Sequence, residues 1–146
     1  MADDISARAL TTSRLIDAPR ERVFAALSDP ALLARWWGPA GFTNTFREFD
    51  FRPGGYWRFV MHGPDGRDYP NESRFEEIVA PERVVFRHLS DHFFEMTITL
   101  WEEGDKTRLD WCQAFETVEG CERVRAVAQP SNEQNLDRLE AVLAVT

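Results

Sequence analysis

The chain has 146 residues and a formal net charge of −8, with 43% hydrophobic and 29% charged residues. This length and composition are typical of a folded globular protein rather than a disordered segment, and we expect one domain spanning residues 1–146. The negative charge disfavours binding to nucleic acid or to an anionic membrane surface, because both carry phosphate groups.

The first part of the chain predicts one strand followed by two short helices. Residues 7–16 suit a strand, although their alternation is imperfect. Pro19 suits the first turn of a helix over residues 19–28, because its missing N–H would have no intrahelical partner there. A second helix over residues 29–37 is predicted to end at Gly38.

From about Thr45 to Phe115, hydrophobic residues recur at every second position, as they do in β-strands. Short turn sequences separate neighbouring runs, and connections that short favour antiparallel hairpins. With a strand beginning near Thr45, we expect six strands in this region. The other runs are residues 55–62, 71–78, 83–89, 93–102 and 106–115.

A last helix is predicted from Ser131 to the end of the chain, because Ser131 stands three residues before a glutamine, which is capping-box spacing. Its inward stripe includes Leu139, with Asn132 and Asn135 near its start. The segment 121–127 has no strong periodicity, and we expect a mobile flap or a short helix there. The order strand, two helices, six strands, helix indicates an α+β fold.

Several short motifs also occur in a characteristic order. They are Asp17-Ala18-Pro19, Trp36-Trp37-Gly38-Pro39, Arg52-Pro53-Gly54-Gly55, Gly63-Pro64-Asp65-Gly66, Ala80-Pro81-Glu82-Arg83-Val84 and Asn135-Leu136-Asp137-Arg138-Leu139-Glu140. With them, nearly the whole chain resembles the START-like (birch-pollen-allergen-like) helix-grip superfamily, and within it the domains named after the activator of heat-shock protein 90 ATPase.

The resemblance implies a seven-stranded curved antiparallel sheet wrapped on a long C-terminal helix, with two short helices between strands 1 and 2. It also implies a cavity between the sheet and the last helix. Members of the superfamily bind lipids, sterols or polyketides, and some cyclise or aromatise polyketides.

The predicted inner face of the sheet is rich in aromatic rings, which favours a concave apolar pocket. The alternative is that these rings interlock as a solid core. The resemblance places Trp36 and Trp37 at the cavity mouth, where one ring can pack on the sheet and the other can form a lid with Phe42. The further residues predicted to bind the ligand are Trp57, Phe59, Met61, Phe75, Phe86, His88, Met96, Trp111, Gln113, Asn132, Asn135 and Leu139.

Two ionisable side chains are candidates for chemistry in such a pocket. His88 is in phase with Phe86, so it should face inward, where it can donate a hydrogen bond or act as an acid or base. The alternative is a core histidine bonded to a backbone carbonyl. Glu77 is in phase with Phe75, and burial would raise the pKa of its carboxyl and make it the best general base. Its alternative is a strand-end carboxylate paired with an arginine such as Arg83.

The sequence contains none of the common motifs for nucleotides, zinc, calcium or serine hydrolases, and we expect neither a metal nor a cofactor. His62, His88 and His92 lack zinc-site spacing, although His88 and His92 can approach each other across a turn. Both cysteines are interpreted as reduced thiols. No apolar run approaches the roughly 18 residues that span a bilayer, and the first residues do not resemble a secretory signal, so we expect a cytoplasmic protein.

Three functions follow from these features. The first is binding or sequestration of a small apolar or aromatic molecule, which the ring-rich inner face with few ionisable groups favours. The second is catalysis of the cyclase or aromatase type, or another proton transfer, by His88 and Glu77. The third is protein interaction, including co-chaperone activity. A homodimer is compatible with all three.

Overall fold

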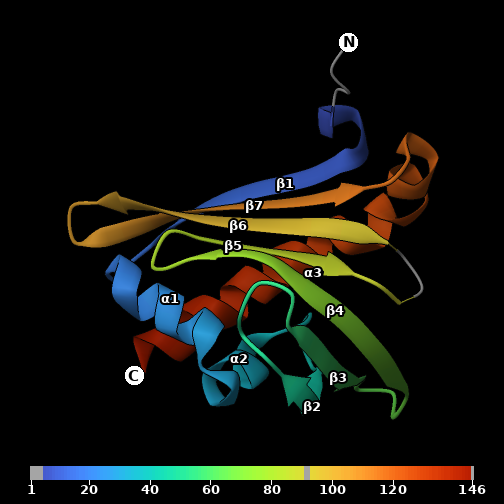
Figure 1. Cartoon of the computed structure of the whole chain (residues 1–146), viewed down its shortest axis with the longest axis horizontal. Helices are drawn as coiled ribbons and strands as arrows, with labels where there is room; N and C mark the ends of the chain where they lie inside the picture. Colours follow the sequence, from blue (N-terminus) through green and yellow to red (C-terminus); the bar gives the residue numbers. More distant parts are fainter. Residues whose placement is uncertain (1–4, 91–92, 146) are drawn as a thin grey trace.

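The computed structural model describes residues 5–90 and 93–145, and Figure 1 shows its course. In this part of the chain, the order of strand, two helices, six strands and helix is as the sequence predicted. No helix among these residues has both the length and the apolar character needed to cross a membrane. The elements are η1 (Ile5–Arg8), β1 (Ala9–Ile16), α1 (Arg20–Ser28), α2 (Pro30–Trp36), β2 (Thr43–Phe49), β3 (Tyr56–His62), β4 (Asp68–Val79), β5 (Arg83–His88), β6 (Phe94–Glu103), β7 (Lys106–Phe115) and α3 (Val118–Ala144).

The seven strands within the described ranges form one curved antiparallel sheet, in the order β1-β7-β6-β5-β4-β3-β2. Strands β2 to β7 follow one another through hairpins, whereas β1 pairs with β7 at the far side. Figure 1 shows α3 crossing behind the sheet, with α1 and α2 near the C-terminal end of α3. This arrangement confirms the helix-grip fold.

The start of α3 differs from the sequence prediction. The helix begins at Val118, where the Thr117 hydroxyl accepts a hydrogen bond from the backbone N–H of Gly120 at 2.9 Å. Ser131 lies inside the helix, and its hydroxyl donates to the backbone oxygen of Val127 at 2.8 Å. The predicted cap at Ser131 is therefore wrong, and the segment 121–127 is part of α3 rather than a separate flap.

The helix continues through Pro130, although an interior proline costs about 3 kcal/mol. Burial of a continuous stripe on α3 outweighs this local penalty. Side chains spaced by three or four residues pack inward along the whole helix, on both sides of the proline. They are Cys121, Val124, Ala128, Asn132, Asn135, Leu136, Leu139, Val142 and Leu143.

The observed helix start at Thr117 and the one expected at Ser131 predict opposite effects of alanine substitutions on the free energy of unfolding. Replacing Thr117 with alanine should lower the free energy of unfolding by about 1 kcal/mol, because a backbone N–H of the first turn loses its acceptor. Replacing Ser131 with alanine should be neutral or slightly stabilising, since alanine has the better helix propensity. Urea denaturation of the two variants checks this. A larger loss for the Ser131 variant would contradict the observed start of α3.

Strand β4 contains an irregularity that changes which side chains face inward. Its pairing with β5 shifts register between Phe75 and Glu77. Phe75 is buried and Ile78 packs against the core, so the inward positions are three residues apart instead of two. Glu76 and Glu77 both lie exposed between them.

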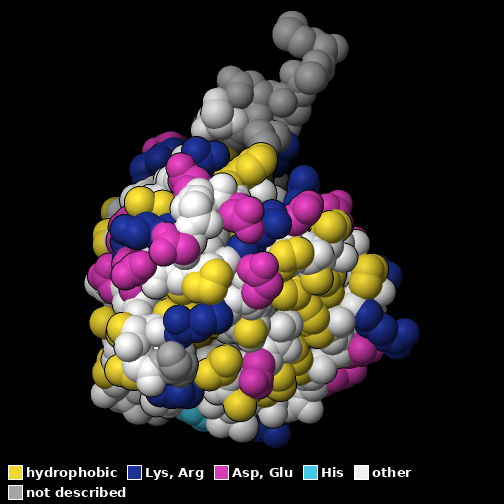
Figure 2. Space-filling view, turned by 90° about the vertical axis from the view of Figure 1, so that its left-hand side faces the viewer, with side chains coloured by type: hydrophobic (Ala, Val, Ile, Leu, Met, Phe, Trp, Pro, Cys, Tyr) yellow, Lys and Arg dark blue, Asp and Glu magenta, His cyan; other side chains and the backbone are white. Residues whose placement is uncertain are grey.

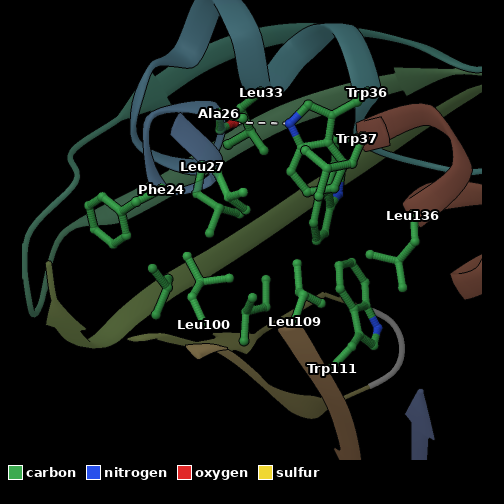
Figure 3. Close-up of a cluster of buried hydrophobic side chains, with 14 of the residues drawn as sticks. Phe24, Ala26, Leu27, Leu33, Trp36, Trp37, Leu100, Leu109, Trp111 and Leu136 are labelled. Carbon is green, nitrogen blue, oxygen red and sulfur yellow. Dashed lines mark hydrogen bonds between the residues drawn. The ribbon is translucent and has the colours of Figure 1, made fainter. Parts of the chain in front are cut away.

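The core lies between the sheet, the two short helices and the C-terminal half of α3. Figure 3 shows Trp36 and Trp37 side by side, with the indole N–H of Trp36 donating to the backbone oxygen of Ala26 at 2.9 Å. The ring of Trp37 is stacked on that of Trp111, with 5.6 Å between their centroids. Leu136 of α3 lies across from these rings.

One arginine fixes α3 to the edge strand β1. Arg14 forms ion pairs with Glu133, Asp137 and Glu140 at 2.7, 2.6 and 2.9 Å. These carboxylates lie on successive turns of α3. The contact anchors the second half of the helix, beyond Pro130, to β1.

Candidate functional site

A cavity of about 420 Å³ opens between the sheet and the first half of α3. Its size lies within the range of roughly 300–1,000 Å³ that is usual for small-molecule sites. It lies where β5 and β7 end and β6 begins, at the right-hand end of the sheet in Figure 1. The residues that line it are Trp37, Phe59, Asn71, Ser73, Phe86, His88, Phe94, Gln113, Phe115, Arg123, Val124, Val127 and Ala128.

The cavity brings together part of the set expected from the sequence. The predicted ligand-binding residues that line it are Trp37, Phe59, Phe86, His88 and Gln113. Four of them come from three strands, β3, β5 and β7, and Trp37 is the residue after α2. Strand alternation predicted that the four strand residues face inward.

Other predicted ligand-binding residues lie in the solid core instead. Six of them have almost completely buried side chains and do not line the cavity. They are Trp36, Trp57, Phe75, Met96, Trp111 and Leu139. The end of the Met61 side chain packs closely against Gly38. The aromatic face therefore forms a packed core beside the C-terminal half of α3, and some of its rings line the cavity beside the first half.

The predicted tryptophan lid is wrong. Trp36 and Trp37 are both buried, and the Trp36 indole is tied to α1. Phe42 instead lies against Tyr69, with 5.8 Å between the ring centroids. The surface side of the cavity is formed by α3, through Arg123 and Val127.

The two asparagines of α3 bind protein groups. Asn132 donates to the side-chain oxygen of Gln113 at 3.0 Å and so fixes that side chain in the cavity wall. Asn135 accepts from the backbone N–H of Gly38 at 3.2 Å and donates to the backbone oxygen of Trp36 at 2.9 Å. Asn135 therefore holds the turn after α2, away from the cavity.

Sequence reasoning missed several of the lining residues. Phe94 and Phe115 are in strand phase with Met96 and Gln113, so alternation was sufficient to find them. The lining residues on α3 were missed because the helix was started too late; they are Arg123, Val124, Val127 and Ala128. Their helical spacing continues that of the later stripe, and this was the available signal.

Ser73 is the most deeply buried polar group of the cavity. Its side chain is 1% exposed, and its hydroxyl has no hydrogen-bond partner among the described residues. It pairs directly across the strands with His88, on the same face of the sheet. An unpartnered buried hydroxyl costs about 1–3 kcal/mol, so this position is unfavourable unless something binds there.

His88 forms part of the cavity wall beside Ser73. Its Nε2 lies 2.7 Å from the Asn71 side-chain oxygen and 3.5 Å from the Ser90 hydroxyl. Since the Asn71 oxygen can only accept, Nε2 is the donor in that bond. The imidazole is stacked on Phe94, with 4.6 Å between centroids and 12° between planes. These side-chain contacts hold the ring in the cavity wall.

Glu77 is not a buried general base. Its carboxylate is about half exposed and lies 3.1 Å from Nε of Arg83, which is the ion pair given by the alternative interpretation. The register shift in β4 is the reason, because it turns Glu77 to the outer face. The described residues that line the cavity include no carboxylate at all.

A second histidine lies in a hydrogen-bonded row on the outer face of the sheet. The Nδ1 atom of His62 lies 2.7 Å from the Asp68 carboxylate, and its Nε2 atom lies 2.7 Å from the Thr45 hydroxyl. None of these three residues lines the cavity. Within the described ranges, no three His, Cys, Asp or Glu side chains are grouped so that they could hold a metal ion. His92 lies outside the described residues.

The opposite end of the molecule also exposes apolar side chains, and Figure 2 shows them among acidic and basic ones. The large ones on the elements that meet there are Leu15, Val79, Trp101 and Val145. The Trp101 indole donates to Asp110 at 2.6 Å, and the Arg108 guanidinium lies 5.5 Å from its ring. Those contacts fix the ring on the sheet surface. We therefore place the candidate site at the cavity, which combines a half-open apolar space with polar groups.

Comparison with known proteins finds one family model and several solved structures that match nearly the whole chain. The family model described as Activator of Hsp90 ATPase homolog 1-like protein matches residues 17–144. A solution structure of a protein from Arthrobacter aurescens is 26% identical, with a TM-score of 0.90, and the match covers 99% of this chain and 91% of that one. A crystal structure from Rhodobacter sphaeroides is 29% identical, with a TM-score of 0.85 and coverage of 95% and 93%. No curated protein matches the chain.

Proposed function

Because the chain belongs to the family of Activator of Hsp90 ATPase homolog 1-like proteins, we propose that it binds a small, largely apolar molecule in the cavity between its sheet and α3. The observation that carries this proposal is the cavity itself, about 420 Å³ in volume and lined mainly by aromatic and aliphatic side chains. Enclosed apolar space with a few fixed polar groups is what small-molecule sites usually offer.

The polar groups of the cavity support binding more than catalysis. Proton transfer to and from a substrate needs an acid or base within hydrogen-bond reach, and usually a second group of different pKa. Glu77 pairs with Arg83 and does not line the cavity, so it cannot act there beside His88 as the enzymatic hypothesis requires. The amide groups of Asn71 and Gln113 offer neutral hydrogen bonds suited to a hydroxyl or carbonyl.

A cavity-filling substitution tests the proposal. Ala128 is half-buried and lines the cavity, whereas Ala126 is exposed on the same helix and does not. The neutral fluorophore N-phenyl-1-naphthylamine should bind the unmodified protein with one site per chain. Its affinity should fall by about tenfold or more in Ala128→Trp, because the indole occupies the ligand's space.

Ala126→Trp is the matched control, since it makes the same change of residue on the same helix and should leave the affinity unchanged. Fluorescence titration measures both variants. Equal binding by the two variants would place the probe elsewhere on the protein. An absence of saturable binding to the unmodified protein would contradict the proposed function. Native mass spectrometry of the purified protein would identify any molecule that stays bound.

A further inference from the structure

The polar groups of the cavity are distributed between two ends. Ser73 lies at the buried end, and Arg123, an exposed residue of α3, lines the cavity on its surface side. Building on the proposed binding function, we propose that the ligand is an aromatic acid. Its ring lies in the cavity, its hydroxyl or carbonyl group meets Ser73, and its acidic group meets Arg123.

The buried end favours a hydrogen-bonding ligand. Ser73 lines the cavity, and its hydroxyl is buried and has no partner among the described residues. Its neighbour His88 is already fixed by Asn71, and the Gln113 oxygen accepts from Asn132. A purely apolar ligand would leave the Ser73 hydroxyl unsatisfied, whereas a hydroxyl or carbonyl on the ligand would satisfy it.

The middle of the cavity favours a flat ring. Phe59, Phe86 and Trp37 form one side of the space, and Phe94 stacks on His88 at another. Aromatic side chains bind aromatic ligands through offset or edge-to-face contacts that a flexible aliphatic chain does not make. This part of the cavity has the lining that a planar molecule needs.

The exposed end favours an anion. Within the described ranges, Arg123 forms neither an ion pair nor a hydrogen bond, whereas Arg125 on the same helix is bound to Glu122 at 2.8 Å. Among the described residues, no carboxylate lines the cavity to compete for the Arg123 guanidinium. The net charge of −8 repels anions at a distance, but salt screens that repulsion beyond about 8–10 Å, and a guanidinium in contact acts within that range.

Three naphthalene probes separate the two ends: 6-hydroxy-2-naphthoic acid carries both groups, 2-naphthoic acid lacks the hydroxyl, and 2-naphthol lacks the acid. The first should bind most tightly to the unmodified protein. Arg123→Gln should weaken binding of both acids by about three- to fivefold and leave 2-naphthol unchanged. Arg125→Gln, the matched control, should change none of them.

Ser73→Ala should weaken 6-hydroxy-2-naphthoic acid by about three- to tenfold and leave 2-naphthoic acid unchanged. The same variant should raise the melting temperature of the ligand-free protein, because it removes an unpartnered buried hydroxyl. A structural role for Ser73 would instead lower it.

Isothermal titration calorimetry and thermal unfolding measure these effects. Equal affinities of the three probes, or equal losses for all three in Arg123→Gln, would overturn this inference while the proposed function stands. If none of these probes nor N-phenyl-1-naphthylamine binds, the proposed function itself fails.

Discussion

Replacing Trp37 with alanine is expected to lower the free energy of unfolding by about 3–5 kcal/mol, the usual loss for a buried tryptophan. The ring contacts Trp57, Phe86 and Trp111 at centroid distances of 5.1, 5.7 and 5.6 Å, and its removal leaves a void among these close-packed rings. Urea denaturation followed by circular dichroism measures the loss.

The same substitution should also change the ligand preference. Trp37 and Phe86 line both the cavity and a small apolar void of about 10 Å³ behind it, so that they separate the two spaces. Removing the indole joins them, and the Trp37 variant should bind bulkier ring systems than the unmodified protein does.

Trp36→Ala is the control for this change. Trp36 is also buried but does not line the cavity, so its loss should destabilise the protein without widening the ligand preference. If both variants shift the preference in the same way, general loosening of the core rather than the position of Trp37 is responsible. Titrations should be made at a temperature where both variants remain folded.

Replacing Arg138 with alanine should cost about 3 kcal/mol or more, because its guanidinium satisfies a set of carbonyls in the turn after α2. It donates at 2.9–3.0 Å to the backbone oxygens of Arg35, Trp37, Gly38, Pro39 and Phe42. Burial lowers the pKa of this guanidinium, and no carboxylate bonds to it within the described residues. Its charge is therefore compensated by backbone dipoles alone.

Arg138→Lys distinguishes the charge from the shape of the side chain. Lysine keeps the charge but lacks the planar fork that reaches several carbonyls at once, so it should recover only part of the lost stability. Arg35→Ala, at an exposed position on α2, should cost less than about 0.5 kcal/mol. Full recovery by lysine would show that the charge alone matters.

The order of elements and the pairing of consecutive strands in the sheet could be predicted from the sequence, because they depend on local signals. Turn residues such as those at 63–66 and 103–105 separate runs of alternating residues, and short connections allow only antiparallel neighbours. Alternation also placed Phe59, Phe86, His88 and Gln113 on the inner face, since side chains of a regular strand repeat every second residue.

The tertiary structure decided the features that interrupt local periodicity. A register shift in β4 turned Glu77 outward, and alternation contains no signal for such a shift. Burial along both halves of α3 carried the helix through Pro130, against its local cost. The position of α3 then determined which aromatic rings are core and which line the cavity. That division depends on long-range packing, and neither turn chemistry nor periodicity encodes it.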